Sequence, residues 1–191
     1  MNIICFDTEW LYNNHKKDEK FNLNCEPILK TLHDFYGIDY IYEKILTRDI
    51  LKHYMEQFKG QRFKNKFQII YFSSHGWNHS ISMEGEPKKN SSIDLEELAN
   101  ISPGFFEGRI VHFSSCRTMK NAAAVCKFKA QTKALQISGY KKSVDAMDSL
   151  VFDMAYFNAL QNYTIQTVAK ETCKFQQRYA SLIDYLQFCI V

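Results

Sequence analysis

Two segments of the chain share a pattern that ends in a reactive side chain. Residues 69–76 read Ile-Ile-Tyr-Phe-Ser-Ser-His-Gly, and residues 110–117 read Ile-Val-His-Phe-Ser-Ser-Cys-Arg. Each is an apolar run followed by two serines and then by the imidazole of His75 or the thiol of Cys116. A thiol with an ordinary pKa near ~8.5 becomes a good nucleophile at neutral pH when a base lies beside it. The pair therefore predicts nucleophilic catalysis, with Cys116 as the nucleophile and His75 as the general base.

The glycine that follows His75 has a chemical use in such a site. A residue without a side chain lets its backbone N–H approach the carbonyl oxygen of a substrate closely. We therefore expect the backbone N–H groups of Gly76 and Cys116 to stabilise the oxyanion that forms when the thiolate attacks.

Strands must position these two motifs. Short apolar runs bounded by turn residues predict strands that are covered on both faces, as in a parallel sheet. They span residues 3–6, 40–45, 67–72, 110–113 and 134–137. In an open parallel sheet ligands bind at the carboxyl ends of the strands. If the two motif strands are neighbours, His75 and Cys116 face each other at that edge.

Helical patterns lie between the predicted strands and give the chain an α/β class with right-handed crossovers. They span residues 26–36, 48–58, 95–98, 121–132 and 145–162. Thr47 and Asp94 are expected to cap two of them, and Gly37 to end the first.

The remaining segments are less regular. Residues 164–185 predict a final helix, and residues 188–191 an edge strand. Residues 13–24 and the basic residues 59–66 are interpreted as solvated loops. Residues 80–92 are interpreted as a hairpin or a flexible insert, because glycine, proline and asparagine interrupt any periodicity.

Strand-Ser-His-Gly followed, after a helix, by strand-Ser-Cys-Arg resembles the caspase-like cysteine peptidases, a group that includes caspases, metacaspases, gingipains and separases. His75 and Cys116 are 41 residues apart, close to the spacing of about 50 in caspases. Residues 135–145 and the helix after them are similar to the segment that follows the catalytic cysteine in bacterial members. The likeness covers about residues 1–162.

The resemblance implies one caspase-like domain over residues 1–191, a three-layer α/β/α sandwich with a mostly parallel sheet. It implies a cysteine endopeptidase that hydrolyses a protein substrate through a thioacyl intermediate, without a cofactor. It also suggests a bacterial stress or defence setting and a dedicated protein partner. Residues 115–118 read Ser-Cys-Arg-Thr and depart from the caspase pattern Gln-Ala-Cys-Arg-Gly, so caspase specificity is not implied.

Acidic residues at the predicted functional edge bear on specificity. Asp7 and Glu9 end the first strand, and in this family that strand end lines the pocket for the residue before the scissile bond. Acids there favour Lys or Arg in the substrate. Asp145 and Asp148 are further candidates, although Asp145 is equally suited to cap a helix. Arg117 argues the other way, since it can pair with an acidic substrate side chain or with one of these acids.

The composition excludes several classes of protein. With 191 residues, 46% of them hydrophobic and 24% charged, the chain fits one globular domain. The net charge of +3 is too small to indicate nucleic-acid binding. No apolar run approaches the roughly 20 residues of a membrane span, and no secretory signal is apparent, so we expect a cytoplasmic protein without a membrane partner. Six cysteines without a CxxC pair fit a reducing compartment, and four of them are interpreted as buried thiols: Cys5, Cys126, Cys173 and Cys189.

Three alternatives compete with the peptidase. A zinc site would need His79 and His112 together with His75 and Cys116, but no metal-binding spacing supports it, and His112 is expected to pack against a helix. A nucleotide-binding domain is disfavoured because no glycine-rich phosphate loop follows a strand. A noncatalytic caspase-like binding module remains as the alternative from another class.

Overall fold

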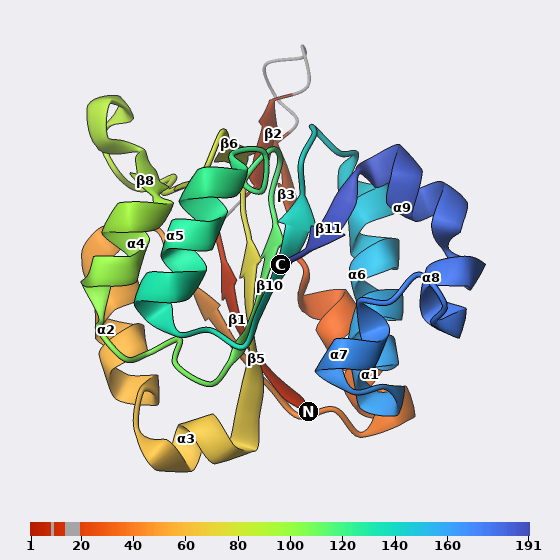
Figure 1. Ribbon diagram of the computed structural model, residues 1–191. Helices are drawn as coiled ribbons and strands as arrows, with labels where there is room; N and C mark the ends of the chain where they lie inside the picture. The colour runs from red at the N-terminus through yellow and green to blue at the C-terminus, as the bar shows by residue number, and fades with distance from the viewer. Residues whose placement is uncertain (9, 14–19) are drawn as a thin grey trace.

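The computed structural model describes residues 1–8, 10–13 and 20–191 (Figure 1). Its centre is a six-stranded sheet in the order β11-β10-β9-β5-β1-β4. The strands are β1 (Asn2–Asp7), β4 (Tyr40–Lys44), β5 (Phe67–Ser73), β9 (Ile110–Ser114), β10 (Gln136–Tyr140) and β11 (Phe188–Ile190). Only β11 is antiparallel to its neighbour, so the other five strands end at the same edge of the sheet.

Helices cover both faces of the sheet and make three layers (Figure 1). One face carries α2 (Arg48–Phe58), α3 (Gln61–Lys66), α4 (Leu95–Ile101) and α5 (Ala122–Thr132). The other carries α1 (Glu26–Tyr36), α6 (Ala146–Asn162), α7 (Ile165–Val168), α8 (Lys174–Arg178) and α9 (Ala180–Leu186). Successive strand residues point to opposite faces. In β1, Ile4 and Phe6 therefore join the first core, and Ile3 and Cys5 join the second. The predicted α/β class with a mostly parallel sheet is confirmed.

A small three-stranded sheet follows β5 and carries the residues after His75. Its strands are β6 (Gly76–Trp77), β7 (Ser80–Ser82) and β8 (Ser92–Asp94), with a short 3-10 helix, η1 (Lys88–Asn90), between the last two. We refer to residues 76–94 as the insert. The structure thus supports the hairpin interpretation of this segment.

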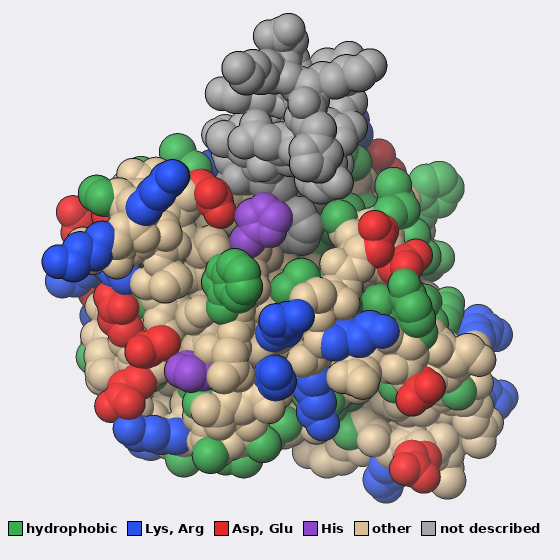
Figure 2. All heavy atoms as spheres, turned by 90° about the horizontal axis from the view of Figure 1, so that it is seen from above, with side chains coloured by type: hydrophobic (Ala, Val, Ile, Leu, Met, Phe, Trp, Pro, Cys, Tyr) green, Lys and Arg blue, Asp and Glu red, His purple; other side chains and the backbone are tan. Residues whose placement is uncertain are grey.

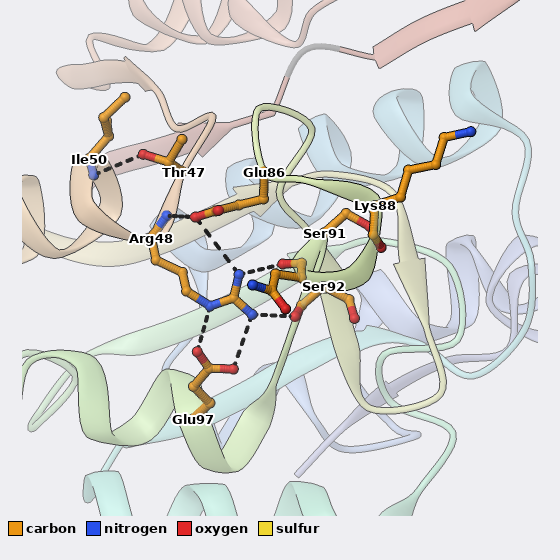
Figure 3. A network of polar contacts seen from close by, with 9 residues as sticks. Thr47, Arg48, Ile50, Glu86, Lys88, Ser91, Ser92 and Glu97 are labelled. Atoms are coloured by element: carbon orange, nitrogen blue, oxygen red, sulfur yellow. Dashed lines mark hydrogen bonds and ion pairs between the residues drawn. The ribbon is translucent and has the colours of Figure 1, made fainter.

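Arg48 fixes the insert to helix α2 (Figure 3). Its guanidinium pairs with Glu97 and Glu86 and donates hydrogen bonds to the backbone oxygens of Asn90 and Ser92. A guanidinium offers five donors in a rigid fork, so one side chain joins several turns of chain at once. The loop that begins at His75 is therefore held at its far end.

The expected helix caps are present. Thr47 accepts a hydrogen bond from the Ile50 N–H at 3.4 Å, and Asp94 accepts one from the Glu97 N–H at 2.8 Å. Gly37 ends α1 in the left-handed conformation, with φ of 65°. The edge strand at the C-terminus is also confirmed, as β11.

Several predicted segments were wrong. Residues 164–185 form three short helices instead of one, because the chain turns at Lys170–Cys173 to bury Cys173 and Phe175. Residues 61–66 are the helix α3, which packs Phe63 against the first core. Within the predicted loop at 13–24, β3 (Lys20–Leu23) pairs with β2 (Trp10–Asn13), and its alternating polar and apolar residues were the overlooked signal. The strand predicted at 134–137 runs from Gln136 to Tyr140.

The four cysteines that were predicted to be buried differ in their exposure. Cys5 and Cys173 are buried as expected, and Cys189 is half-buried. Cys126 is exposed, which contradicts the prediction. Helix α5 is rich in alanine, so its periodicity says little about which face packs, and Val125 and Phe128 occupy the inner face instead.

Candidate active site

The two sequence motifs end side by side. Strands β5 and β9 are neighbours, with Ser73 paired to Ser114, and the Ser74 N–H donates to the Ser114 oxygen at 3.4 Å. His75 follows Ser74 and is exposed, and Cys116 follows Ser115 and is half-buried. Figure 2 looks down on this edge of the molecule. Adjacent strand ends are what the sequence predicts.

His75 and Cys116 line one hollow of about 570 Å³. The other described residues that line it are Gly76, Trp77, Ser82, Glu84, Arg117 and Ser143. Four predicted site residues, His75, Gly76, Cys116 and Arg117, are therefore brought to a single concave surface. A hollow of this size can take a few residues of an extended peptide.

The turn that holds Cys116 is tightly anchored. Arg117 adopts the left-handed conformation, with φ of 59°, and its N–H donates to the Lys142 oxygen at 3.0 Å. Thr118, which is buried, donates its hydroxyl to the Ser80 oxygen at 3.0 Å, which ties the turn to the insert. A strained backbone conformation is retained where the surrounding structure fixes it, and such positions cluster at functional sites.

Val144 adds a group that sequence reasoning missed. Its backbone N–H donates to the Cys116 sulfur at 3.4 Å, and its carbonyl oxygen lies 3.8 Å from the same sulfur. These two backbone groups fix the position of the sulfur at the edge of the hollow. Because the donor is a backbone group on a loop after β10, no residue type in the sequence could have indicated it.

Gly76 is required by packing as well as by chemistry. A Cβ atom at this position would lie 2.6 Å from the Cys116 carbonyl oxygen, 2.7 Å from Thr118 Oγ1 and 2.8 Å from Ser115 Cβ. The backbone after His75 therefore runs directly against the turn that carries the thiol, and any side chain would push the two apart.

We expect Gly76→Ala to lower the free energy of unfolding by about 1–3 kcal/mol, the usual cost of overpacking. Chemical denaturation of the two proteins measures the effect. Gly60→Ala is the matched control, because a Cβ there meets nothing within 4 Å. A Gly76→Ala variant with unchanged stability would show that this close approach is absent in solution.

Asp7 lies buried at the end of β1. Its Oδ2 accepts hydrogen bonds from the Tyr42 hydroxyl at 2.8 Å and from the Cys25 N–H at 3.1 Å. Its Oδ1 accepts none from the described residues, and the buried hydroxyls of Thr8 and Ser74 at the same strand ends are likewise without a partner there. Burial raises the pKa of Asp7 above its usual range, against the effect of these hydrogen bonds.

None of the predicted substrate acids Asp7, Asp145 and Asp148 is among the described residues that line the hollow. Asp145 caps α6, where its Oδ1 accepts the N–H groups of Met147 at 2.8 Å and Asp148 at 3.3 Å. Asp148 lies half-buried in the first turn of that helix. Glu9 falls outside the described residues. Glu84 of the insert is the acid that does line the hollow, and sequence reasoning overlooked it because the insert had no predicted position.

The comparison with protein families covers nearly the whole chain. The sequence matches one family model over residues 2–191. The chain belongs to the DUF6642 family, a family of unknown function. No curated protein matches it.

His112 is separate from the hollow. It is fully buried, with Nε2 2.6 Å from Asp153 Oδ1 and Nδ1 2.9 Å from Ser138 Oγ, and α6 supplies the aspartate. The prediction that His112 packs against a helix is confirmed. Across the described part of the DUF6642 chain, no three His, Cys, Asp or Glu side chains are grouped to hold a metal ion. No helix in that part is long and apolar enough to cross a membrane.

Proposed function

We propose that this DUF6642 chain is a caspase-like cysteine endopeptidase in which His75 activates Cys116. The observation that carries the proposal is the shared hollow: an imidazole and a thiol leave adjacent strand ends and line one concave surface. A nucleophile beside a base at the carboxyl edge of a parallel sheet is the arrangement that acyl transfer needs.

The proposed reaction uses only groups of this chain. His75 accepts the thiol proton of Cys116, and the thiolate attacks the carbonyl carbon of the scissile peptide bond. The N–H groups of Gly76 and Cys116 stabilise the oxyanion. When the carbon–nitrogen bond breaks, His75 gives its proton to the leaving amine, and a thioester remains on Cys116. His75 then takes a proton from water, which attacks the thioester and releases the acid and the free thiol.

Asp7 supports a preference for Lys or Arg immediately before the scissile bond. Its Oδ1 and the hydroxyls of Thr8 and Ser74 are buried acceptors without a described partner. Buried polar groups in folded proteins are nearly always hydrogen-bonded, so unused acceptors at a strand end favour a ligand with several N–H donors. An ammonium or guanidinium group meets that need.

Fluorogenic peptides that vary at this one position test the specificity. We expect hydrolysis after Lys and Arg and little after other residues. A preference for Asp, or for large apolar residues, would refute the acidic pocket and leave the dyad in place. Absence of hydrolysis of every peptide, together with an unreactive thiol, would favour a noncatalytic binding module.

Asp7→Asn is expected to act in opposite directions on stability and activity. Because burial raises the folded-state pKa of Asp7, the folded protein holds this proton more tightly than the unfolded chain, and stability falls as pH rises through that raised pKa. The asparagine variant should therefore be the more stable protein at pH 7, with no advantage below the unfolded pKa of about 4. Its cleavage after Lys or Arg should fall at least roughly 30-fold.

Denaturation at pH 7 and at pH 3.5, with hydrolysis of a lysine peptide, measures both effects. Asp49→Asn on helix α2 is the control, since this acid is exposed in the first turn of a helix away from the hollow. If Asp7→Asn destabilised the protein at neutral pH, the ionised carboxylate would be making a favourable contact beyond those with Tyr42 and Cys25.

A further inference from the structure

Basic side chains gather beside the hollow, on the two loops that follow β9 and β10. They are Arg117, Lys120, Lys141 and Lys142, which we call the basic cluster. A backbone hydrogen bond from the Arg117 N–H to the Lys142 oxygen joins the two loops, and one from the Lys120 N–H to the Arg117 oxygen closes a turn within the first loop, each at 3.0 Å. Figure 2 shows Lys and Arg side chains gathered near the middle of this face.

The basic cluster has no acidic partner among the described residues. Some other basic groups in that part of the chain do: Arg48 pairs with Glu97, Lys64 with Glu107 and Lys127 with Glu96. The whole chain carries a net charge of only +3. Four basic side chains on two adjacent loops give this part of the surface, beside the turn that carries the thiol, a local positive potential.

The cluster rests on ordered backbone. Thr118, between Arg117 and Lys120, is buried and bonded to the insert. The Met119 N–H donates to the Tyr140 oxygen at 3.1 Å, and the Lys142 ammonium lies 4.2 Å from the centre of the Tyr185 ring. A ligand would therefore meet charges whose positions are largely set, which lowers the entropic cost of binding.

Two groups of acidic residues lie near the basic cluster and affect how much of its charge is balanced. Glu84 lines the same hollow as His75 and Arg117. Glu171 and Asp184 line a separate hollow with Lys141, so the charge of that lysine is partly balanced. Of the other three, Arg117 lines the hollow itself, and Lys120 and Lys142 lie on the same two loops beside it.

We propose that the substrate of this site carries acidic side chains within a few residues of the scissile bond, which bind Arg117, Lys120 and Lys142. This inference rests on the proposed function, because it assumes that a peptide lies across the hollow. Charge complementarity selects the partner and speeds its encounter more than it adds affinity. A peptide fits better than a nucleic acid, since a basic patch confined to two loops is shorter than the stripe that a phosphate backbone needs.

Binding to the Cys116→Ala protein tests the inference without cleavage. The probes are two fluorescent peptides with one lysine, flanked on both sides either by glutamates or by glutamines. We expect roughly tenfold tighter binding of the glutamate peptide at low salt, and a smaller difference at high salt. Lys120→Glu/Lys142→Glu should remove the difference, whereas Lys30→Glu/Lys52→Glu, which makes the same charge change on α1 and α2, should keep most of it.

Lys120→Gln/Lys142→Gln, checked by circular dichroism, replaces the charge reversal if that variant fails to fold, and it should lose most of the preference. Equal binding of the two peptides would overturn the inference. So would tighter binding of a single-stranded oligonucleotide of equal charge. Hydrolysis of both peptides at equal rates by the wild type would refute the acidic preference alone, and tight binding of the glutamate peptide without any hydrolysis would refute the proposed function alone.

Discussion

Cys116→Ala is expected to reduce peptide hydrolysis on the order of 10⁴-fold or more, and His75→Ala by a similar factor. The thiol is the nucleophile of the proposed mechanism and carries the thioester, and the imidazole supplies the proton transfers. Residues that act as one unit are strongly non-additive, so the double variant should be little slower than either single variant. Initial rates with a lysine peptide, at matched circular dichroism spectra, give the measurement.

Cys126→Ala provides the matched control. Cys126 is an exposed thiol only ten residues further along the chain, on the outer face of α5. We expect it to leave hydrolysis almost unchanged. An equal loss in Cys126→Ala would mean that the wrong thiol has been assigned, and full activity in Cys116→Ala would end the peptidase proposal.

Asp153→Ala should be the most destabilising single change of a side chain described above, by about 3–5 kcal/mol, because it leaves buried partners without an acceptor. The Asp153 carboxylate accepts hydrogen bonds from Tyr71 on β5 at 2.9 Å and from Tyr140 on β10, and it lies 2.6 Å from His112 on β9. One carboxylate on α6 thus joins three strands. His112 and Asp153 are both fully buried, with 0% side-chain exposure.

Denaturant midpoints measure this effect, with Asp148→Ala as the control on the same helix. Asp148 lies in the first turn of α6, where loss of a favourable helix-dipole interaction costs at most about 1 kcal/mol. A change of less than 1 kcal/mol in Asp153→Ala would show that water or another acceptor replaces the carboxylate. Since His112, Asp153 and Ser138 are closed to solvent, their resemblance to a hydrolytic triad has no catalytic meaning.

Much of the sheet could be predicted because its strands are buried on both faces. Ile3, Ile4, Ile69 and Ile70 are fully buried, so the strands read as continuous apolar runs. The strand predicted at 134–137 was placed too early, because the polar Ser138 and Gly139 interrupt the apolar run of β10. Ser138 can be buried there because it is hydrogen-bonded to His112. The C-terminal helices were mispredicted for another reason: their breaks depend on burial of Cys173 and Phe175 in the second core, which no local pattern encodes.

The candidate site was predictable where a reactive residue followed a strand. His75, Gly76, Cys116 and Arg117 all line the hollow because β5 and β9 deliver them there. The role of Asp145 was less predictable, because an aspartate at that position can either cap a helix or line a pocket. In the structure it caps helix α6. Trp77 and Glu84 come from the insert, whose position depends on Arg48 and on the three-stranded sheet. Trp77 is 63% exposed. Because it is only two residues from His75 in the sequence, it could have been predicted as a site residue.

Reaction with a peptide chloromethyl ketone that carries lysine before the reactive group tests the central claim most directly. Alkylation is mapped by mass spectrometry in Cys126→Ala protein, so that the exposed thiol does not compete. The proposed mechanism predicts one adduct, on Cys116. It should form much faster than the adduct with iodoacetamide at equal concentration, and it should be largely lost in His75→Ala. An unmodified Cys116, or a rate that depends neither on the peptide nor on His75, would contradict it.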